Sequence, residues 1–192
     1  MLSLRNRAEL YNAKFPDYPP LVCTDRWLYG VWMLGNDYRS KQGFYGEYPP
    51  NYLKRITSLF PDCVPVLHLF SGSLGEDCGG IRFDIDESGK PDVIGDAEQL
   101  SSYFPEDFFS VIYADPPYSG EDAQHYGHCL VNRNKVVAEC VRVMRDGGFL
   151  VWLDQVLPMY RKSGLALVGT IGVIRSTNHR FRVVNIFQKG VA

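Results

Sequence analysis

The feature that most constrains the fold of this chain is the junction between residues 108–114 and the four residues after them, Asp115, Pro116, Pro117 and Tyr118, here called the proline motif. Residues 108–114 form an apolar run rich in β-forming side chains, which is typical of a buried strand. The two prolines fix their own φ angles, remove two backbone donors and hold Asp115 in an extended conformation. In open α/β sheets, ligands bind at the carboxyl ends of the strands. The junction therefore predicts an α/β fold with a chemical site after this strand.

The groups that remain in the proline motif are nearly all hydrogen-bond acceptors. The Asp115 carboxylate and the Pro116 carbonyl can together accept both hydrogens of a planar amino group, and the Tyr118 ring offers a surface on which the parent base can stack. A proline-rich loop without a chemical role is the alternative. The motif resembles the catalytic motif of the S-adenosylmethionine-dependent amino-methyltransferases, which methylate exocyclic amino groups of adenine, cytosine or guanine. The resemblance implies that Asp115, Pro116, Pro117 and Tyr118 are catalytic and that S-adenosylmethionine is the cofactor.

A second junction lies upstream, where the β-forming run at residues 64–70 breaks into a glycine-rich loop at residues 71–75. The loop resembles the methionine-binding loop of the same family, in which small residues let a ligand approach the backbone. The chain departs from the family pattern at His68, where an acidic residue is usual, and at Gly75, which falls one place late. A GxGxxG fingerprint is absent, which disfavours a nicotinamide enzyme. The resemblance implies cofactor contacts from these residues: Phe70, Ser71, Gly72 and Ser73.

Acidic residues end the next two predicted strands. By the resemblance, Asp84, with Asp86 in reserve, binds the ribose hydroxyls of the cofactor, and Asp96, with Ala97 beside it, binds the adenine. A carboxylate suits a diol because it can accept two hydrogen bonds. Each acid taken alone is more typical of a turn or a helix cap. The order of glycine-rich loop, acid, acid and proline motif favours the methyltransferase interpretation.

The spacing of the strands indicates a Rossmann-like sheet in which some helices are reduced. Only residues 76–80 separate the glycine-rich loop from the strand predicted at residues 81–86, whereas a parallel crossover that contains a helix needs about 10–12 residues. The connection to the next strand, at residues 91–97, is equally short. The resemblance implies a seven-stranded methyltransferase sheet with reduced helices between strands one and two and between strands two and three. This trimming leaves a face on which a protein partner, a second copy of the chain or the N-terminal segment could pack.

The second half of the chain is more regular. A stripe of apolar residues predicts a helix that ends near Asp146 and the two glycines after it, Gly147 and Gly148. Residues 149–153 follow as a buried strand. Residues 166–175 and 180–188 are predicted to form the antiparallel hairpin that closes the sheet.

Residues 1–62 are rich in aromatic side chains, and we expect them to pack on or cap the core of a single domain that spans residues 1–192. A Gly-x-Tyr-x-Pro outline near the end of this segment resembles the one that amino-methyltransferases acting on DNA place ahead of the glycine loop. The resemblance implies a contact between Tyr48 and the methionine end of the cofactor. A hydrophobic cover over the sheet is the alternative.

Candidate substrate contacts follow the proline motif and occupy the final hairpin. Ser119 and Tyr126 belong to a loop long enough to close over a substrate. His179 and Arg180, with Arg182 nearby, form a basic hairpin tip that could bind phosphates, although such a tip is also a common solvated feature. We predict no metal site, because the histidines and cysteine at residues 125–129 match no established ligand spacing.

Composition limits the partners and the compartment. The formal net charge of −2 gives no global attraction to nucleic acid, so such binding depends on a local basic patch. Five cysteines without a CxxC pair argue against a disulfide framework. No apolar run approaches the roughly 20 residues of a membrane span, and the start of the chain lacks a signal-like apolar block. We therefore expect a cytoplasmic protein that does not bind a membrane.

Together these features predict methyl transfer from S-adenosylmethionine to an exocyclic amino group of a nucleic acid base, with N6 of adenine in DNA as the leading substrate. DNA is favoured over RNA as the partner. An RNA base or a small molecule is the alternative substrate, and a catalytically silent methyltransferase-fold scaffold subunit is the alternative class. The irregular glycine-rich loop and His68 favour the silent subunit, whereas the intact proline motif opposes it.

Overall fold

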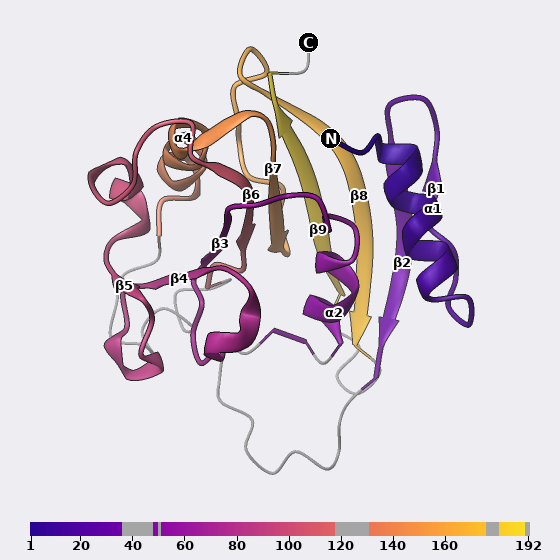
Figure 1. Cartoon of the computed structure of the whole chain (residues 1–192), viewed down its shortest axis with the longest axis horizontal. Helices are drawn as coiled ribbons and strands as arrows, with labels where there is room; N and C mark the ends of the chain where they lie inside the picture. The colour runs from indigo at the N-terminus through magenta and orange to yellow at the C-terminus, as the bar shows by residue number, and fades with distance from the viewer. Residues whose placement is uncertain (36–47, 50, 118–130, 176–180, 191–192) are drawn as a thin grey trace.

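The computed structural model describes residues 1–35, 48–49, 51–117, 131–175 and 181–190. Within these ranges the chain forms a nine-stranded sheet in the order β1-β2-β8-β9-β7-β6-β3-β4-β5 (Figure 1). All of the strands except β1 and β9 run in the same direction. Their bounds are β1 (Val22–Cys23), β2 (Leu28–Leu34), β3 (Val66–Leu69), β4 (Ile81–Asp84), β5 (Val93–Ile94), β6 (Phe109–Ala114), β7 (Met144–Asp154), β8 (Leu165–Arg175) and β9 (Phe181–Lys189).

Seven of these strands, from β8 to β5 in the sheet order, form the sheet that the sequence predicts. Strands β7, β6, β3, β4 and β5 are parallel, and β9 runs antiparallel between β7 and β8. The β8–β9 pair is the predicted closing hairpin. The fold class is therefore confirmed, and the N-terminal segment adds two strands that the sequence did not reveal.

Short 3-10 turns replace the first two crossover helices, as the residue spacing predicts. Turn η1 (Glu76–Cys78) joins β3 to β4, and turn η2 (Glu87–Gly89) joins β4 to β5. A longer 3-10 segment, η3 (Ala97–Ser102), follows β5. Strands β3, β4 and β5 are only 4, 4 and 2 residues long, so few backbone hydrogen bonds between strands hold the starts of the loops that follow them.

One face of the sheet is covered by the N-terminal segment. Helices α1 (Leu4–Lys14) and α2 (Tyr52–Thr57) lie on this face (Figure 1). Their buried side chains share one apolar core with strands β2, β6, β7, β8 and β9, and its largest members include Tyr11, Trp32 and Tyr52. These buried aromatic side chains therefore contribute to packing.

Helix α1 is fixed to this core by a fully buried arginine. Arg7 donates two hydrogen bonds to the Asp62 carboxylate, at 2.6 and 3.1 Å, and one to the Leu59 carbonyl at 2.8 Å. Its guanidinium also lies 5.1 and 4.8 Å from the ring centroids of Phe60 and Phe149. Burial alone would raise the pKa of Asp62, but the hydrogen bonds from Arg7 lower it to about 2. This ion pair is therefore a structural anchor for the first helix.

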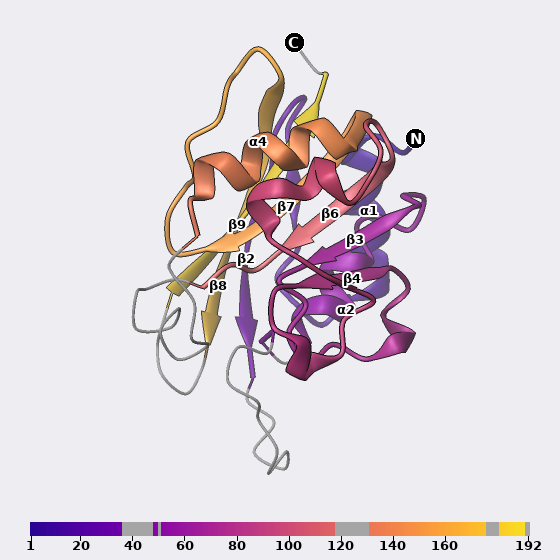
Figure 2. The same ribbon diagram turned by 90° about the vertical axis from the view of Figure 1, so that its left-hand side faces the viewer.

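The opposite face carries helix α4 (Arg133–Val143), which packs on η3 and β7 (Figure 2). The helix ends earlier than the predicted end near residues 146–148. The reason is that Met144 already has an extended backbone and pairs with Phe109 of β6. The glycines lie inside β7 instead, where Gly147 has a φ of 76°.

The two strands of the N-terminal segment lie at the edge of the sheet opposite the trimmed strands. Strand β2 pairs in parallel with β8, from Leu28 opposite Gly169 to Leu34 opposite Arg175. The expectation that this segment could pack near the trimmed strands is therefore wrong for its strands. Strand β8 is 11 residues long and offers an extended edge for pairing, whereas β5 has only two residues.

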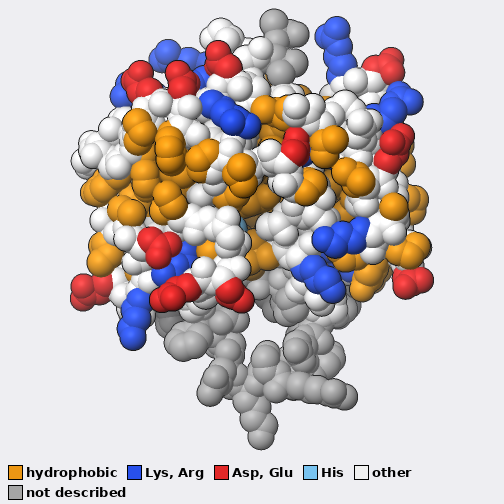
Figure 3. Space-filling model, in the orientation of Figure 1, with side chains coloured by type: hydrophobic (Ala, Val, Ile, Leu, Met, Phe, Trp, Pro, Cys, Tyr) orange, Lys and Arg blue, Asp and Glu red, His pale blue; other side chains and the backbone are white. Residues whose placement is uncertain are grey.

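Charged side chains of both signs are interspersed over the face seen in Figure 3. This mixture agrees with the small formal net charge of −2. In the part of the chain that the structure describes, no helix combines the length and the apolar character needed to cross a bilayer.

Candidate active site

The parallel strands bring the predicted site residues to one edge of the sheet. Strand β3 ends at Leu69, β4 at Asp84, β6 at Ala114 and β7 at Asp154, and these neighbouring strands share one direction. Their carboxyl ends therefore lie side by side, where open α/β sheets bind ligands. The glycine-rich loop, Asp84 and the proline motif all start from this edge.

Asp115 is the first residue after β6, and its carboxyl group is desolvated. Burial raises the pKa of Asp115 to about 8; the positive charge of Arg182 lowers it and the negative charge of Asp154 raises it further. Pro116 beside it is buried, whereas Asp115 as a whole residue is half-buried. A carboxyl group of this kind changes protonation state near neutral pH, as catalytic acids and bases do.

Tyr48 connects the proline motif with the end of β4. Its ring stacks on Tyr52 of α2, with centroids 5.3 Å apart, and its buried hydroxyl has no hydrogen-bond partner among the residues that the structure describes. Burial raises the pKa of Tyr48 well above its ordinary value, and the negative charges of Asp115 and Asp84 contribute to the rise. The hydroxyl therefore lies within electrostatic range of both carboxylates.

The glycine-rich loop adopts an unusual backbone. Phe70 has a φ of 61° and Gly72 a φ of 51°, and a positive φ at a residue other than glycine persists only where the surroundings impose it. The Gly72 amide donates to Asp84 Oδ2 at 2.7 Å, which ties the loop to the end of β4. Within the described part of the chain, the buried Ser71 hydroxyl has no hydrogen-bond partner. The loop thus holds an unsatisfied polar group that a ligand could pair with.

The three predicted acidic residues each have a structural partner. Asp84 accepts two backbone amides, at 2.7 and 3.0 Å. Asp86 caps η2, and Asp96 caps η3 by accepting the Glu98 amide at 2.9 Å. A carboxylate offers about four lone-pair sites, so Asp84 and Asp96 retain capacity to accept further hydrogen bonds. Both interpretations of these residues, as caps and as cofactor contacts, are compatible with this geometry.

The remaining predicted residues divide between described and undescribed parts of the chain. Ser73 is exposed on the glycine-rich loop, and Ala97, the first residue of η3, is buried in the core. Among the described residues, no group of three or more His, Cys, Asp or Glu side chains could hold a metal ion. The histidines and cysteine at residues 125–129 lie outside the described residues. So do these predicted site residues: Tyr118, Ser119, Tyr126, His179 and Arg180.

Two charged residues beside the proline motif were not predicted. Arg133, at the start of α4, donates from Nε to Asp154 Oδ2 at 2.7 Å and from Nη2 to the Pro117 carbonyl at 3.3 Å. Asp154 directly follows an apolar strand, which is the signal that singled out Asp115, so the sequence could have revealed it. Arg133 carries no such signal, because only the packing of α4 brings it to this edge.

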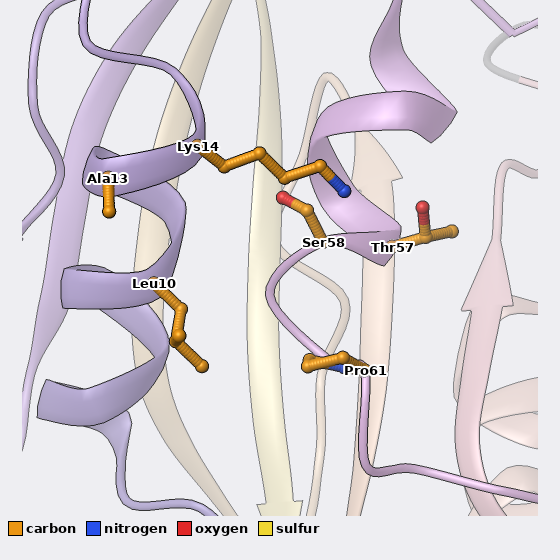
Figure 4. Close-up of a pocket in the computed structure, with 6 residues that line it drawn as sticks. All are labelled: Leu10, Ala13, Lys14, Thr57, Ser58 and Pro61. Atoms are coloured by element: carbon orange, nitrogen blue, oxygen red, sulfur yellow. The ribbon is translucent and has the colours of Figure 1, made fainter.

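A separate groove of about 490 Å³ lies between α1 and the end of α2. Lys14 is the one charged group among its lining residues, and no predicted site residue belongs to it. We therefore assign the candidate site to the carboxyl edge of the sheet. The six residues that line the groove are drawn in Figure 4: Leu10, Ala13, Lys14, Thr57, Ser58 and Pro61.

No protein-family model and no curated protein matches this chain. Among solved structures, TrmN from Thermus thermophilus is 19% identical over 65% of this chain and 43% of that chain, with a TM-score of 0.46. A SAM dependent methyltransferase from Archaeoglobus fulgidus is 18% identical over 54% of this chain and 50% of its own, with a TM-score of 0.39. An rRNA methylase from Streptococcus thermophilus is 10% identical over 65% and 86%, with a TM-score of 0.43. The matched region thus spans half or less of the first two proteins.

Proposed function

We propose that this protein is an S-adenosylmethionine-dependent methyltransferase that methylates an exocyclic amino group of a nucleic acid base, with N6 of adenine in DNA as the substrate. The observation that supports it most directly is the placement of the Asp115 carboxyl between the end of β6 and two prolines, at the edge where the parallel strands end. The glycine-rich loop and Asp84 leave the same edge of the sheet.

The residues at this edge suit S-adenosylmethionine. The buried, unpaired hydroxyls of Ser71 and Tyr48 need partners, and the acceptor capacity of Asp84 suits a ribose diol. When bound, this cofactor supplies an electrophilic methyl group on a positively charged sulfur. The residues proposed to hold it are Tyr48, Phe70, Ser71, Gly72, Ser73, Asp84, Asp86, Asp96 and Ala97.

In the proposed mechanism, Asp115 and Pro116 orient the amino group of the base by accepting its two hydrogens. This pull favours a pyramidal nitrogen whose lone pair is exposed, and the fixed acceptors stabilise the positive charge that develops there. The nitrogen loses a proton when it gains a methyl group. Once ionised, a carboxyl with a pKa of about 8 is basic enough to accept that proton.

The proposed nucleic acid contacts come from the loops beyond the described residues. Tyr118 stacks on the extruded base, since a base cannot be methylated inside the duplex. Arg182 is half-buried and its charge acts on Asp115, so we assign it to the carboxylate rather than to a phosphate. Four residues remain as candidate contacts with the substrate: Ser119, Tyr126, His179 and Arg180.

Transfer of a radiolabelled methyl group to DNA, RNA and pooled metabolites tests this proposal. We expect the label in adenine of DNA, released as N6-methyladenine after hydrolysis. Label confined to RNA or to metabolites would contradict the substrate. A chain that binds no S-adenosylmethionine by calorimetry would contradict the reaction itself.

Asp115→Ala tests the catalytic assignment. We expect methyl transfer to fall at least about a hundredfold, the usual scale for loss of a positioned acid or base, while cofactor affinity stays within a few-fold. Asp25→Ala is the matched control, because the Asp25 side chain is 99% exposed and belongs to no site. A loss of cofactor binding in Asp115→Ala as large as the loss of transfer would contradict the assignment.

The pKa of Asp115 also predicts a pH dependence. Since the carboxyl must be ionised to accept the proton, kcat/KM should rise with pH and level off above about pH 8. Asp115→Asn should retain only a residual rate without this rise. A wild-type profile that stays flat between pH 6 and pH 9 would argue against proton transfer to Asp115.

A further inference from the structure

Asp154, at the end of β7, is a completely buried carboxylate with a full set of donors. Trp152 Nε1 donates to Oδ2 at 3.1 Å, and the Gln155 amide donates to Oδ1 at 2.7 Å. Arg133 bridges both oxygens, from Nε to Oδ2 at 2.7 Å and from Nη2 to Oδ1 at 3.4 Å. A carboxylate held by neutral and charged donors in this way has a fixed position.

The same guanidinium reaches the proline motif. Arg133 Nη2 donates to the Pro117 carbonyl at 3.3 Å, so one planar group joins the end of β7 to the turn after β6. Pro117 has no N–H of its own, and its carbonyl is therefore the backbone group through which the turn can be held at this residue. The Arg133 side chain is 16% exposed, so these hydrogen bonds are largely shielded from water.

The surroundings of Asp115 make the charge of this pair matter. Asp154 acts on the Asp115 carboxyl with a negative charge and Arg182 with a positive one. Without Arg133, the charge of Asp154 beside Asp115 would lose its counterion. Among the described residues, these groups interact electrostatically with Asp115 from the packed elements: Arg182 (β9), Asp154 (β7), Tyr48 and Tyr52 (before and on α2), with Arg133 (α4) bonded to Asp154.

We infer that Arg133 and Asp154 form a positioning pair for Asp115, in which the guanidinium holds the Pro117 carbonyl and balances the charge of Asp154 beside the Asp115 carboxyl. The inference rests on the proposed methyl transfer and adds two residues that act through Asp115 without contacting the substrate. Arginine suits this position because its planar fork can bridge a carboxylate and a carbonyl at once, which a lysine ammonium does not reproduce.

Four variants separate the geometric effect from the electrostatic one. Arg133→Lys keeps the charge but loses the fork, Arg133→Met loses both, and Arg133→Met with Asp154→Asn removes both charges of the pair. Arg142→Met is the matched control, since Arg142 lies on the same helix, is 61% exposed and pairs with Glu139, which keeps its hydrogen bonds from Ser101 when Arg142 is replaced. The measurements are kcat, KM and the pH profile of methyl transfer, together with the pKa of Asp115 from carbon-13 NMR of its carboxyl group.

For Arg133→Lys we expect kcat to fall about ten- to a hundredfold, the scale of a small misplacement in the site, with KM for the cofactor and the pKa of Asp115 unchanged. In Arg133→Met the pKa of Asp115 should also rise, moving the pH profile to higher pH. The double variant should restore the pKa of Asp115 toward that of the wild type while kcat stays low. Arg142→Met should match the wild type in every measurement.

Failure of this inference can be told apart from failure of the proposed function. An inactive wild-type protein would overturn the methyl transfer, while the NMR shift in Arg133→Met would still test the pair. An active wild type, with the same kcat in Arg133→Lys or the same pKa of Asp115 in Arg133→Met, would overturn the pair. If Arg133→Met does not fold, as judged by circular dichroism, the kcat of Arg133→Lys decides.

Discussion

The two halves of the sheet position their loops in different ways. Strands β7, β8 and β9 are 11, 11 and 9 residues long and are stabilised by apolar cores on the sheet faces. Strands β3, β4 and β5 are much shorter, and polar side chains hold their loops: Asp84 accepts the Gly72 amide, and Arg82 donates to both Asp92, at 2.7 Å, and the Leu74 carbonyl, at 3.0 Å. Where the crossover helices are reduced, hydrogen bonds made by buried or half-buried charged groups position the loops instead.

The long-stranded half should respond most strongly when the fully buried charge of Arg7 is removed. Arg7→Met keeps the apolar contact with Phe60 and Phe149 but leaves Asp62 without its partner. Removing one partner of a buried ion pair costs about 3–5 kcal/mol. Because Asp62 is partly exposed, we expect the free energy of unfolding to fall by about 3 kcal/mol. Urea denaturation at pH 7 measures it.

Arg5→Met is the matched control for that experiment. Arg5 lies on the same helix and pairs with Asp25 at 3.5 Å, but the two side chains are 61% and 99% exposed. Exposed pairs contribute between about 0 and 1 kcal/mol, so the control should unfold nearly as the wild type does. Equal stability of the Arg7 and Arg5 variants would remove the anchoring function that we assign to Arg7.

The short-stranded half should respond to a single added methyl group. A Cβ at Gly89 in η2 would overlap the Gly72 carbonyl, so Gly89→Ala forces the glycine-rich loop to move. We expect a loss of about 2 kcal/mol of stability, typical of an overpacked site, and weaker binding of S-adenosylmethionine. Thermal unfolding and calorimetry measure the two effects.

Gly164→Ala is the control, because its new Cβ would meet only Val141 Cγ1 at an ordinary 3.8 Å. It should change neither stability nor cofactor affinity appreciably. If Gly89→Ala binds the cofactor as tightly as Gly164→Ala does, the close approach of Gly89 in η2 to the Gly72 carbonyl does not position the glycine-rich loop.

The smallest effect is expected at His68, on β3 where the two halves meet. Its ring stacks on Tyr113 at 5.3 Å, and burial lowers the pKa of His68 from 6.5 to about 4, partly offset by the Cys78 backbone. Between about pH 6.5 and about pH 4, His68 is therefore protonated in the unfolded chain but not in the folded protein. The free energy of unfolding decreases as the pH falls through this range. His68→Phe keeps the stack and lacks this loss, which corresponds to about 1 kcal/mol at pH 5.5.

Comparison of unfolding at pH 7.5 and pH 5.5 isolates this titration. His68→Gln, which keeps polar atoms but does not titrate here, should lose the same pH dependence as His68→Phe while differing from it in stability at neutral pH. A pH dependence in His68→Phe equal to that of the wild type would show that another group is responsible.

Much of the sheet could be predicted because the signals are local. The apolar run before Asp115 and the short connections around residues 76–80 and 87–91 depend on neighbouring residues alone, and the corresponding strands and 3-10 turns are present. The end of α4 was predicted too late, because the pairing of Met144 with Phe109 overrides the glycine signal that follows. Backbone pairing with a strand that is distant in the sequence cannot be predicted from the residues next to Met144.

The sequence by itself determined which segments become the seven predicted strands of the sheet, and that a carboxylate follows one of them. The reason is that the pattern of apolar residues, the prolines and the glycines act on the residues next to them. Only the tertiary structure decided that β2 extends the β8 edge, that burial raises the pKa of Asp115, and that Arg133 meets Asp154 and the Pro117 carbonyl. These features join residues far apart in the chain. Their contacts and desolvation come from packing, which no short stretch of sequence specifies.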